Sequence, residues 1–91
     1  MTHAIVLVEA ERTSMATLGP ELAEIEGVGG VYSVTGEWDF VAVVHVKRHE
    51  DLRDVVTTRI GNLTGVARTL TMVAFEVFSR HDLESMFSIG E

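Results

Sequence analysis

Two short stretches of this chain are apolar at every position, and they constrain the fold more than any other feature. Residues 4–8 and 40–44 are rich in β-branched side chains, a composition typical of strands. A strand with one face in water should alternate apolar and polar residues. Both strands therefore need cover on two faces. Neither run approaches the roughly 18–20 residues that a membrane-spanning helix requires, so the cover has to come from protein.

Four segments carry strand signals. They are residues 4–8, 31–35, 40–46 and 66–78. The second and third are separated by Gly36-Glu37-Trp38-Asp39, a spacing short enough for a hairpin. The fourth is the longest, with room for a bulge.

Two segments have helical periodicity. The first spans about 14–26, where apolar residues recur at three- and four-residue steps; its stripe is Met15, Leu18, Leu22 and Ile25. Gly19-Pro20 interrupts it, so this helix either starts near Thr17 or bends there, because proline lacks the amide hydrogen. Glycines at 27, 29 and 30 are expected to end it. The second helix begins near His49 and ends at Gly61-Asn62, and its buried stripe is Leu52, Val55, Val56 and Ile60.

The element order β-α-β-β-α-β predicts an α+β fold of the ferredoxin-like type. Each half restarts after its helix with a Gly-Val pair, at Gly30-Val31 and Gly65-Val66. Right-handed crossovers then interleave the halves into a four-stranded antiparallel sheet with both helices on one face. The other face is left open and apolar. We expect a second copy to cover it, sheet against sheet or edge to edge, as in dimeric α/β barrels.

The charge balance argues against nucleic acid as a direct partner. The chain has 14 acidic and 7 basic residues, a formal net charge of −7, and the basic residues are scattered. Phosphate contacts need clustered Lys and Arg. The N-terminus lacks the features of a signal peptide, and there is no Cys. We therefore expect a cytoplasmic protein without disulfides and without contact with a membrane.

No pattern of catalytic or metal-binding residues stands out. The histidines lack the spacing of metal-ligand pairs, and there is no Gly-x-Ser-x-Gly or phosphate-binding glycine loop. The four histidines are His3, His45, His49 and His81. We predict no catalytic residue, no metal and no cofactor. An enzyme of the dimeric α/β-barrel type, such as a monooxygenase or isomerase, is the alternative, with His45 and Trp38 lining a cavity.

The strongest candidate site combines the hairpin Gly36-Glu37-Trp38-Asp39 with Arg68-Thr69-Leu70-Thr71 on the last strand. In the predicted topology the second and fourth strands are opposite edges of the sheet. The two segments are therefore expected to meet only across a subunit boundary. A simpler interpretation is that the hairpin only makes a turn, and that the threonines fill a strand they favour.

Two motifs, V-T-G-E-W-D-F at 34–40 and G-V-A-R-T-L-T at 65–71, resemble the effector-binding domain of the Lrp/AsnC family of transcriptional regulators, also called the RAM domain. The resemblance covers about residues 3–80. It implies a βαββαβ fold that forms homodimers through its sheets and then higher rings. It also implies that small effectors such as amino acids bind between dimers.

Carried over by position, the resemblance implies a ligand-binding set of Gly36, Glu37, Trp38, Asp39, Thr69 and Thr71. Asp39 would meet the ligand's ammonium group. The threonine hydroxyls and the amides near Gly36 would meet its carboxylate, because a buried charge needs partners.

One departure from the family concerns DNA binding. Full-length members carry a helix-turn-helix domain that this chain lacks, so we expect a stand-alone sensing domain. Its effect on transcription would be indirect, for example through co-assembly with a full-length Lrp/AsnC relative. A purely structural oligomerisation module is the other non-enzymatic alternative.

The whole chain, residues 1–91, is expected to form a single domain with a C-terminal extension at 79–91. Asp82 could cap a short helix there, and Leu83, Met86 and Phe87 would fall on one face of it. That face either packs on a neighbouring subunit or caps the core of its own chain.

Overall fold

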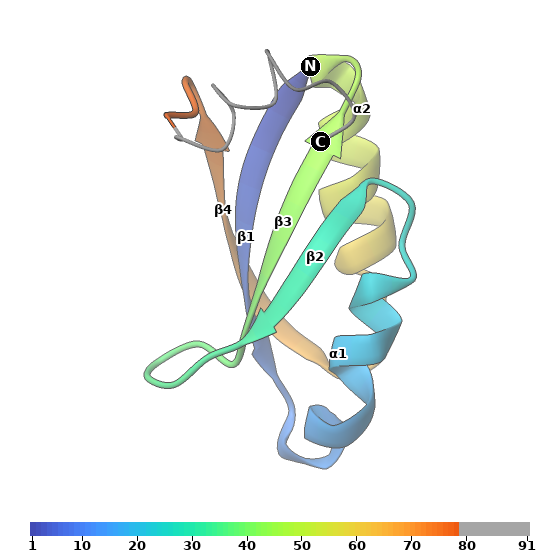
Figure 1. The fold of residues 1–91 in the computed structure, drawn as a ribbon. Helices are drawn as coiled ribbons and strands as arrows, with labels where there is room; N and C mark the ends of the chain where they lie inside the picture. The colour runs from blue at the N-terminus through green and yellow to red at the C-terminus, as the bar shows by residue number, and fades with distance from the viewer. Residues whose placement is uncertain (79–91) are drawn as a thin grey trace.

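The computed structural model describes residues 1–78. They form a four-stranded antiparallel sheet in the order β2-β3-β1-β4, with the helices on one face (Figure 1). The elements in chain order are β1 (Thr2–Ala10), the 3-10 turn η1 (Arg12–Ser14), α1 (Met15–Ala23), β2 (Val28–Ser33), β3 (Phe40–Val46), α2 (His49–Arg53), the π-helical η2 (Asp54–Ile60) and β4 (Val66–Ala74). The predicted ferredoxin-like fold is confirmed. The helix predicted around 82–87 lies outside the described residues.

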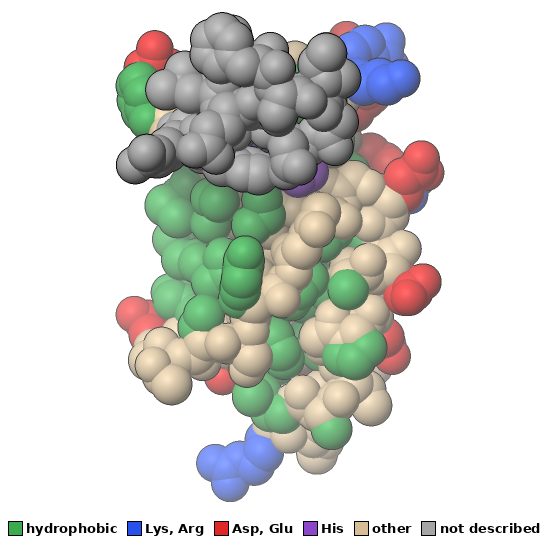
Figure 2. All heavy atoms as spheres, viewed as in Figure 1, with side chains coloured by type: hydrophobic (Ala, Val, Ile, Leu, Met, Phe, Trp, Pro, Cys, Tyr) green, Lys and Arg blue, Asp and Glu red, His purple; other side chains and the backbone are tan. Residues whose placement is uncertain are grey.

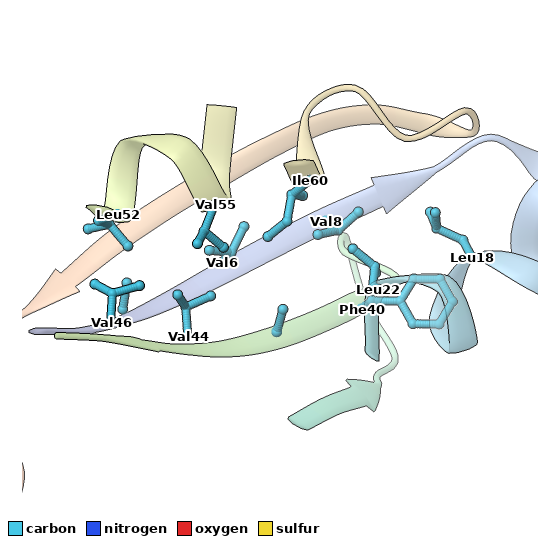
Figure 3. Packing of buried hydrophobic residues seen from close by; sticks show 12 residues of the cluster. Val6, Val8, Leu18, Leu22, Phe40, Val44, Val46, Leu52, Val55 and Ile60 are labelled. Carbon is cyan, nitrogen blue, oxygen red and sulfur yellow. The ribbon is translucent and has the colours of Figure 1, made fainter. Parts of the chain in front are cut away.

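The core lies between the sheet and the helices (Figure 3). The central strands β1 and β3 alternate strictly, and every second side chain is turned toward the helices and buried. From the sheet these are Ala4, Val6, Val8, Phe40, Ala42, Val44 and Val46; from the helices they are Leu18, Leu22, Leu52, Val55 and Ile60. Full burial of one such Val, Leu or Ile contributes about 1.5–3 kcal/mol. Leu18 and Leu22 of the first predicted stripe are therefore turned toward the sheet, as are Leu52, Val55 and Ile60 of the second. Ile25 and Val56 are partly buried against this core. The placement of Met15 in the buried stripe was wrong, since it is 41% exposed.

The same turn leads from each helical segment into the next strand. The amides of Val28 and Val66 each donate to the carbonyl three residues earlier, at 3.0 and 3.3 Å. The residue before each valine is a glycine with positive φ, 101° at Gly27 and 102° at Gly65. A type II turn requires such a residue at its third position. The repeated pairs are therefore Gly27-Val28 and Gly65-Val66, and the prediction of Gly30-Val31 as the first pair was wrong.

Both edge strands differ in extent from the prediction. β2 begins at Val28 instead of residue 31, because pairing with β3 overrides the low strand preference of glycine. Gly29 is the extra residue of a bulge between the pairs Val28–Val44 and Gly30–Val43. β4 ends at Ala74 instead of residue 78, since Ala74 pairs with His3 near the start of β1. Only Thr2 of β1 lies beyond that pair, so β1 offers almost no further backbone for β4 to pair with.

The two helices also show features that the sequence did not predict. α1 begins at Met15, next to the start predicted at about residue 14, so the alternative start near Thr17 was wrong, and the helix continues through Pro20. Pro20 is exposed, so the carbonyl left without a helical partner can be solvated. The second helix begins at His49 as predicted, but it continues in π-helical form. There the Gly61 amide donates to the carbonyl five residues earlier at 2.9 Å.

Candidate functional site

The sheet face turned away from the helices, the open face, is apolar in its middle. The strand register places Val43, Ile5 and Met72 side by side in one row, and Val41, Leu7 and Leu70 in the next. Tyr32 of β2 pairs with Val41 and extends the second row. Leu70, Met72 and Tyr32 are 47%, 46% and 63% exposed. Figure 2 shows hydrophobic side chains gathered on this side of the molecule. The apolar surplus predicted from the sequence is therefore on the surface of the single chain.

Four side chains, the hairpin cluster, lie at one end of the open face: Glu9, Glu37, Trp38 and Arg68. The Arg68 guanidinium donates from Nε to Glu9 Oε1 at 2.7 Å and from Nη2 to Glu37 Oε2 at 2.9 Å. Its central carbon lies 4.3 Å from the centre of the Trp38 ring, within the range of a cation–π contact. The hydrogen bonds that Arg68 donates to Glu9 and Glu37 raise the pKa of Arg68 above its ordinary value. The cluster holds a fixed guanidinium beside an aromatic face.

The hairpin cluster corrects one expectation. The hairpin and the last strand were predicted to meet only across a subunit boundary, but Glu37 and Trp38 contact Arg68 within one chain. The loop at 34–39 reaches across the end of the sheet toward β4 (Figure 1). Only β1 separates β3 from β4, a gap of about 10 Å at two strand spacings. A six-residue loop with long side chains at its tip spans that gap.

Asp39 fastens the hairpin to β1. Its carboxylate Oδ2 accepts from the Ala10 amide at 2.8 Å, and its own amide donates to the Val8 carbonyl at 3.0 Å. The Asp39 carbonyl accepts from the Val34 amide at 3.0 Å, which closes the loop. Asp39 therefore has a structural role in the single chain, and any ligand would have to use the remaining lone pairs of its carboxylate.

The two predicted threonines lie apart from the hairpin. Thr69 pairs with Val8 and Thr71 with Val6, so both occupy the side of β4 that faces the helices. Thr71 borders a groove of about 430 Å³ between β4 and the helix α2–η2, together with His49, Leu52, Val56 and Val73. Within one chain, the structure thus brings Glu37 and Trp38 to Arg68 but leaves Thr69 and Thr71 on the other face of the strand.

A pair of histidines occupies the opposite end of the open face. His3 and His45 are direct partners across β1 and β3, and their Nδ1 atoms are 3.1 Å apart. Their positions are 42 residues apart in the chain, so no local spacing could have indicated the pair. Among residues 1–78, no three His, Asp or Glu side chains are grouped to hold a metal ion.

The two residues of the enzyme alternative do not converge within one chain. His45 is at the His3 end of β1, whereas Trp38 packs on Arg68 at the Glu9 end. Six residues of strand separate these ends, roughly 20 Å. A shared cavity in the single chain is therefore ruled out for this pair.

Solved structures with the same arrangement define the class of the fold. A Thermus thermophilus protein superimposes with a TM-score of 0.82 and 45% identity, covering 88% of this chain and all of that one. A hypothetical protein from Pyrococcus horikoshii gives a TM-score of 0.76 at 25% identity, with 89% and 95% covered. A transcriptional regulator from Neisseria meningitidis shares the fold at a TM-score of 0.77 and 12% identity, over 86% of this chain and 52% of that one.

Sequence relatives narrow the class. An uncharacterized helix-turn-helix-type transcriptional regulator of Pyrococcus furiosus is 34% identical over 77 residues, which are 81% of this chain and 51% of the regulator. A regulator of the same description from Pyrococcus abyssi is 31% identical over 78 residues, 82% and 52% of the two chains. The chain spans about half the length of the curated relatives it matches.

A family model identifies the family of this chain. The model of the Lrp/AsnC ligand-binding domain matches residues 3–83, and the chain belongs to this family. The resemblance noted in the two motifs is thereby confirmed. None of the helices described within residues 1–78 has the length and apolar character needed to span a bilayer.

Proposed function

We propose that this chain is a regulatory domain that senses a small molecule, an amino acid or a closely related metabolite, and that it catalyses no reaction. The observation that carries the proposal is the match of residues 3–83 to the Lrp/AsnC ligand-binding domain. Its curated relatives are named as transcriptional regulators. We propose that the chain acts in the cytoplasm and affects transcription only indirectly, through co-assembly with a full-length relative.

The functional unit that we propose is a homodimer formed through the open face, assembling further into a ring. The support for this dimer is the exposure of apolar side chains on the open face. Leu70, Met72 and Tyr32 leave about half of their apolar surface in water, and each such side chain forgoes part of the roughly 1.5–3 kcal/mol that burial supplies. An exposed apolar patch of this kind typically marks a protein interface.

The effector site that we propose combines the hairpin residues Gly36, Glu37, Trp38 and Asp39 of one copy with Thr69 and Thr71 of another. A second copy is needed because the threonines are on the far side of β4 from the hairpin in their own chain. The ammonium group of the effector would use the oxygen lone pairs of Asp39 that Ala10 leaves free. The threonine hydroxyls would donate to its carboxylate.

A thermal-shift screen of the 91-residue chain against the twenty amino acids tests the proposal. Methionine comes first, because the Neisseria meningitidis regulator with this fold was solved in complex with L-Met. A ligand at 100 times its dissociation constant stabilises by about 2.7 kcal/mol, a shift of several degrees for a small domain. No shift with any of the twenty would contradict amino-acid sensing and favour a scaffold or an enzyme.

The residues of the site are tested separately. Trp38 is the only tryptophan, so its fluorescence should change on binding at the hairpin. Asp39→Asn keeps an acceptor for the Ala10 amide but removes the charge, and binding should be lost while the unfolding midpoint stays nearly constant. Thr69→Val should weaken binding about tenfold, because it removes one hydrogen bond and the loss of about 1.4 kcal/mol raises the dissociation constant by that factor. Thr58→Val, on the exposed side of η2, is the matched control and should change nothing.

A further inference from the structure

The histidine pair His3–His45 has a geometry that its place in the sheet enforces. The amide of His45 donates to the Gly27 carbonyl at 2.8 Å, on the side away from β1. His3 and His45 are therefore a pair without mutual backbone hydrogen bonds, the arrangement in which facing side chains lie closest. The two rings stand at 88° with centroids 5.1 Å apart, so their Nδ1 atoms face each other at the edge.

Gly29 helps to fix the ring of His45. A Cβ atom at position 29 would lie 2.2 Å from His45 Nε2, so no other residue could occupy the position without displacing the ring. Gly29 is the extra residue of the β2 bulge, which brings its backbone against the imidazole. The Nε2 side of His45 is thus packed on β2, and Nδ1 is the nitrogen presented to His3.

We propose that His3 and His45 form a binding site for a divalent transition-metal ion, with Cu²⁺, Ni²⁺ and Zn²⁺ as the ions it suits. Imidazole nitrogens are good ligands for these metals. Nitrogens at about 2.0–2.1 Å from one ion lie about 2.9–3.4 Å apart at tetrahedral or square-planar angles. The observed 3.1 Å falls within that range, so an ion can be bound without moving either strand.

The site differs from the proposed effector site in place and in chemistry. It is at the other end of β1 from the hairpin cluster, and it needs no second copy. In the single chain His45 is exposed and His3 is half-buried, so an ion and its waters have access to the pair there. Without metal, one ring donates its Nδ1 hydrogen to the other ring. Binding an ion requires the donor ring to carry its hydrogen on Nε2 instead, because the ligating nitrogen of a neutral imidazole bears no hydrogen.

Calorimetry and thermal unfolding of the tag-free 91-residue chain test the proposal, with NiCl₂, ZnCl₂ and CuCl₂ as probes and MgCl₂ as the hard-cation control. We expect one ion per chain for the transition metals, a rise of about 5 °C in the unfolding midpoint at saturation, and reversal by EDTA. Magnesium should have no effect, since it prefers oxygen ligands. Absence of binding by all three transition metals would overturn the proposal.

Variants locate the site. His3→Ala and His45→Ala should each abolish the shift, and because both side chains have access to solvent, circular dichroism should show an intact fold. His49→Ala is the matched control and should keep full binding. Electron paramagnetic resonance of the Cu²⁺ form should show two nitrogen ligands, reduced to one in His3→Gln. Binding that survives both His3→Ala and His45→Ala, or that is lost in His49→Ala, would refute this assignment.

Discussion

Replacing Leu70 by Ala should weaken self-association more than it weakens the fold. Leu70 is in the middle of the open face and is 47% exposed. Complete burial of a leucine side chain is worth about 1.5–3 kcal/mol, so the exposed half accounts for about 0.7–1.4 kcal/mol. A two-fold dimer buries the residue twice, which doubles the loss to about 1.4–2.8 kcal/mol. Since about 1.4 kcal/mol is a factor of ten, the dissociation constant should rise about ten- to one-hundredfold.

Sedimentation equilibrium over a wide concentration range measures this change. Met15→Ala is the matched control, because Met15 is similarly exposed, at 41%, but belongs to α1 on the other side of the sheet. It should leave the dissociation constant unchanged. If the native chain is a 10 kDa monomer throughout, or if Leu70→Ala and Met15→Ala behave alike, pairing through the open face is refuted.

Four further substitutions probe the fold itself. Ile60→Ala, at a fully buried position, should lower the free energy of unfolding in urea by about 2–5 kcal/mol. Gly65→Ala should cost more than the roughly 1–2 kcal/mol of left-handed backbone strain, because φ is 102° there and the new Cβ would lie 2.5 Å from Ser14 Cβ. Gly30→Ala meets no atom within 4 Å and should be nearly neutral. The hydrogen bond from Arg48 lowers the pKa of Asp51, so the small stabilisation from this pair should be present at neutral pH and lost as the pH falls through the lowered pKa. Asp51→Asn should remove that acid-side dependence from urea midpoints measured across pH.

The central strands and the buried sides of the helices could be predicted because burial produces a local pattern of apolar residues in the sequence. The bounds predicted for β3, 40–46, match those observed. Apart from Met15, which is exposed, the helical stripes were correct for the same reason: each three- or four-residue step marks one side of a helix that the sheet covers. Leu18, Leu22 and Ile60 are fully buried. The apolar open face was also predicted, since a strand that is apolar at every position has to be covered on both of its faces.

The contacts between distant segments could not be predicted, because they depend on register. Arg68 meets Glu9 from 59 positions away, and His3 meets His45 from 42. Shifting either pairing by one residue would turn these side chains to opposite faces, and no local pattern distinguishes the two registers. The start of β2 was missed for a related reason, since its glycines are placed by their partners in β3.

The bulge where β4 meets β1 determines which side chains reach the open face. Arg68 pairs with Glu9, but the next pair is Ala10 with Val66, so Ala67 is the extra residue. This insertion lets Val66 pack against the core while Arg68 stays in the hairpin cluster. Deleting Ala67 would leave Val66 and Arg68 adjacent in a regular ladder, still opposite Ala10 and Glu9 and on opposite faces of the sheet. The urea midpoint and the Trp38 fluorescence should therefore both stay nearly unchanged. A deletion variant with a lower urea midpoint or altered Trp38 fluorescence would show that one of the two side chains has left its face, and would refute the assignment of Ala67 as the extra residue.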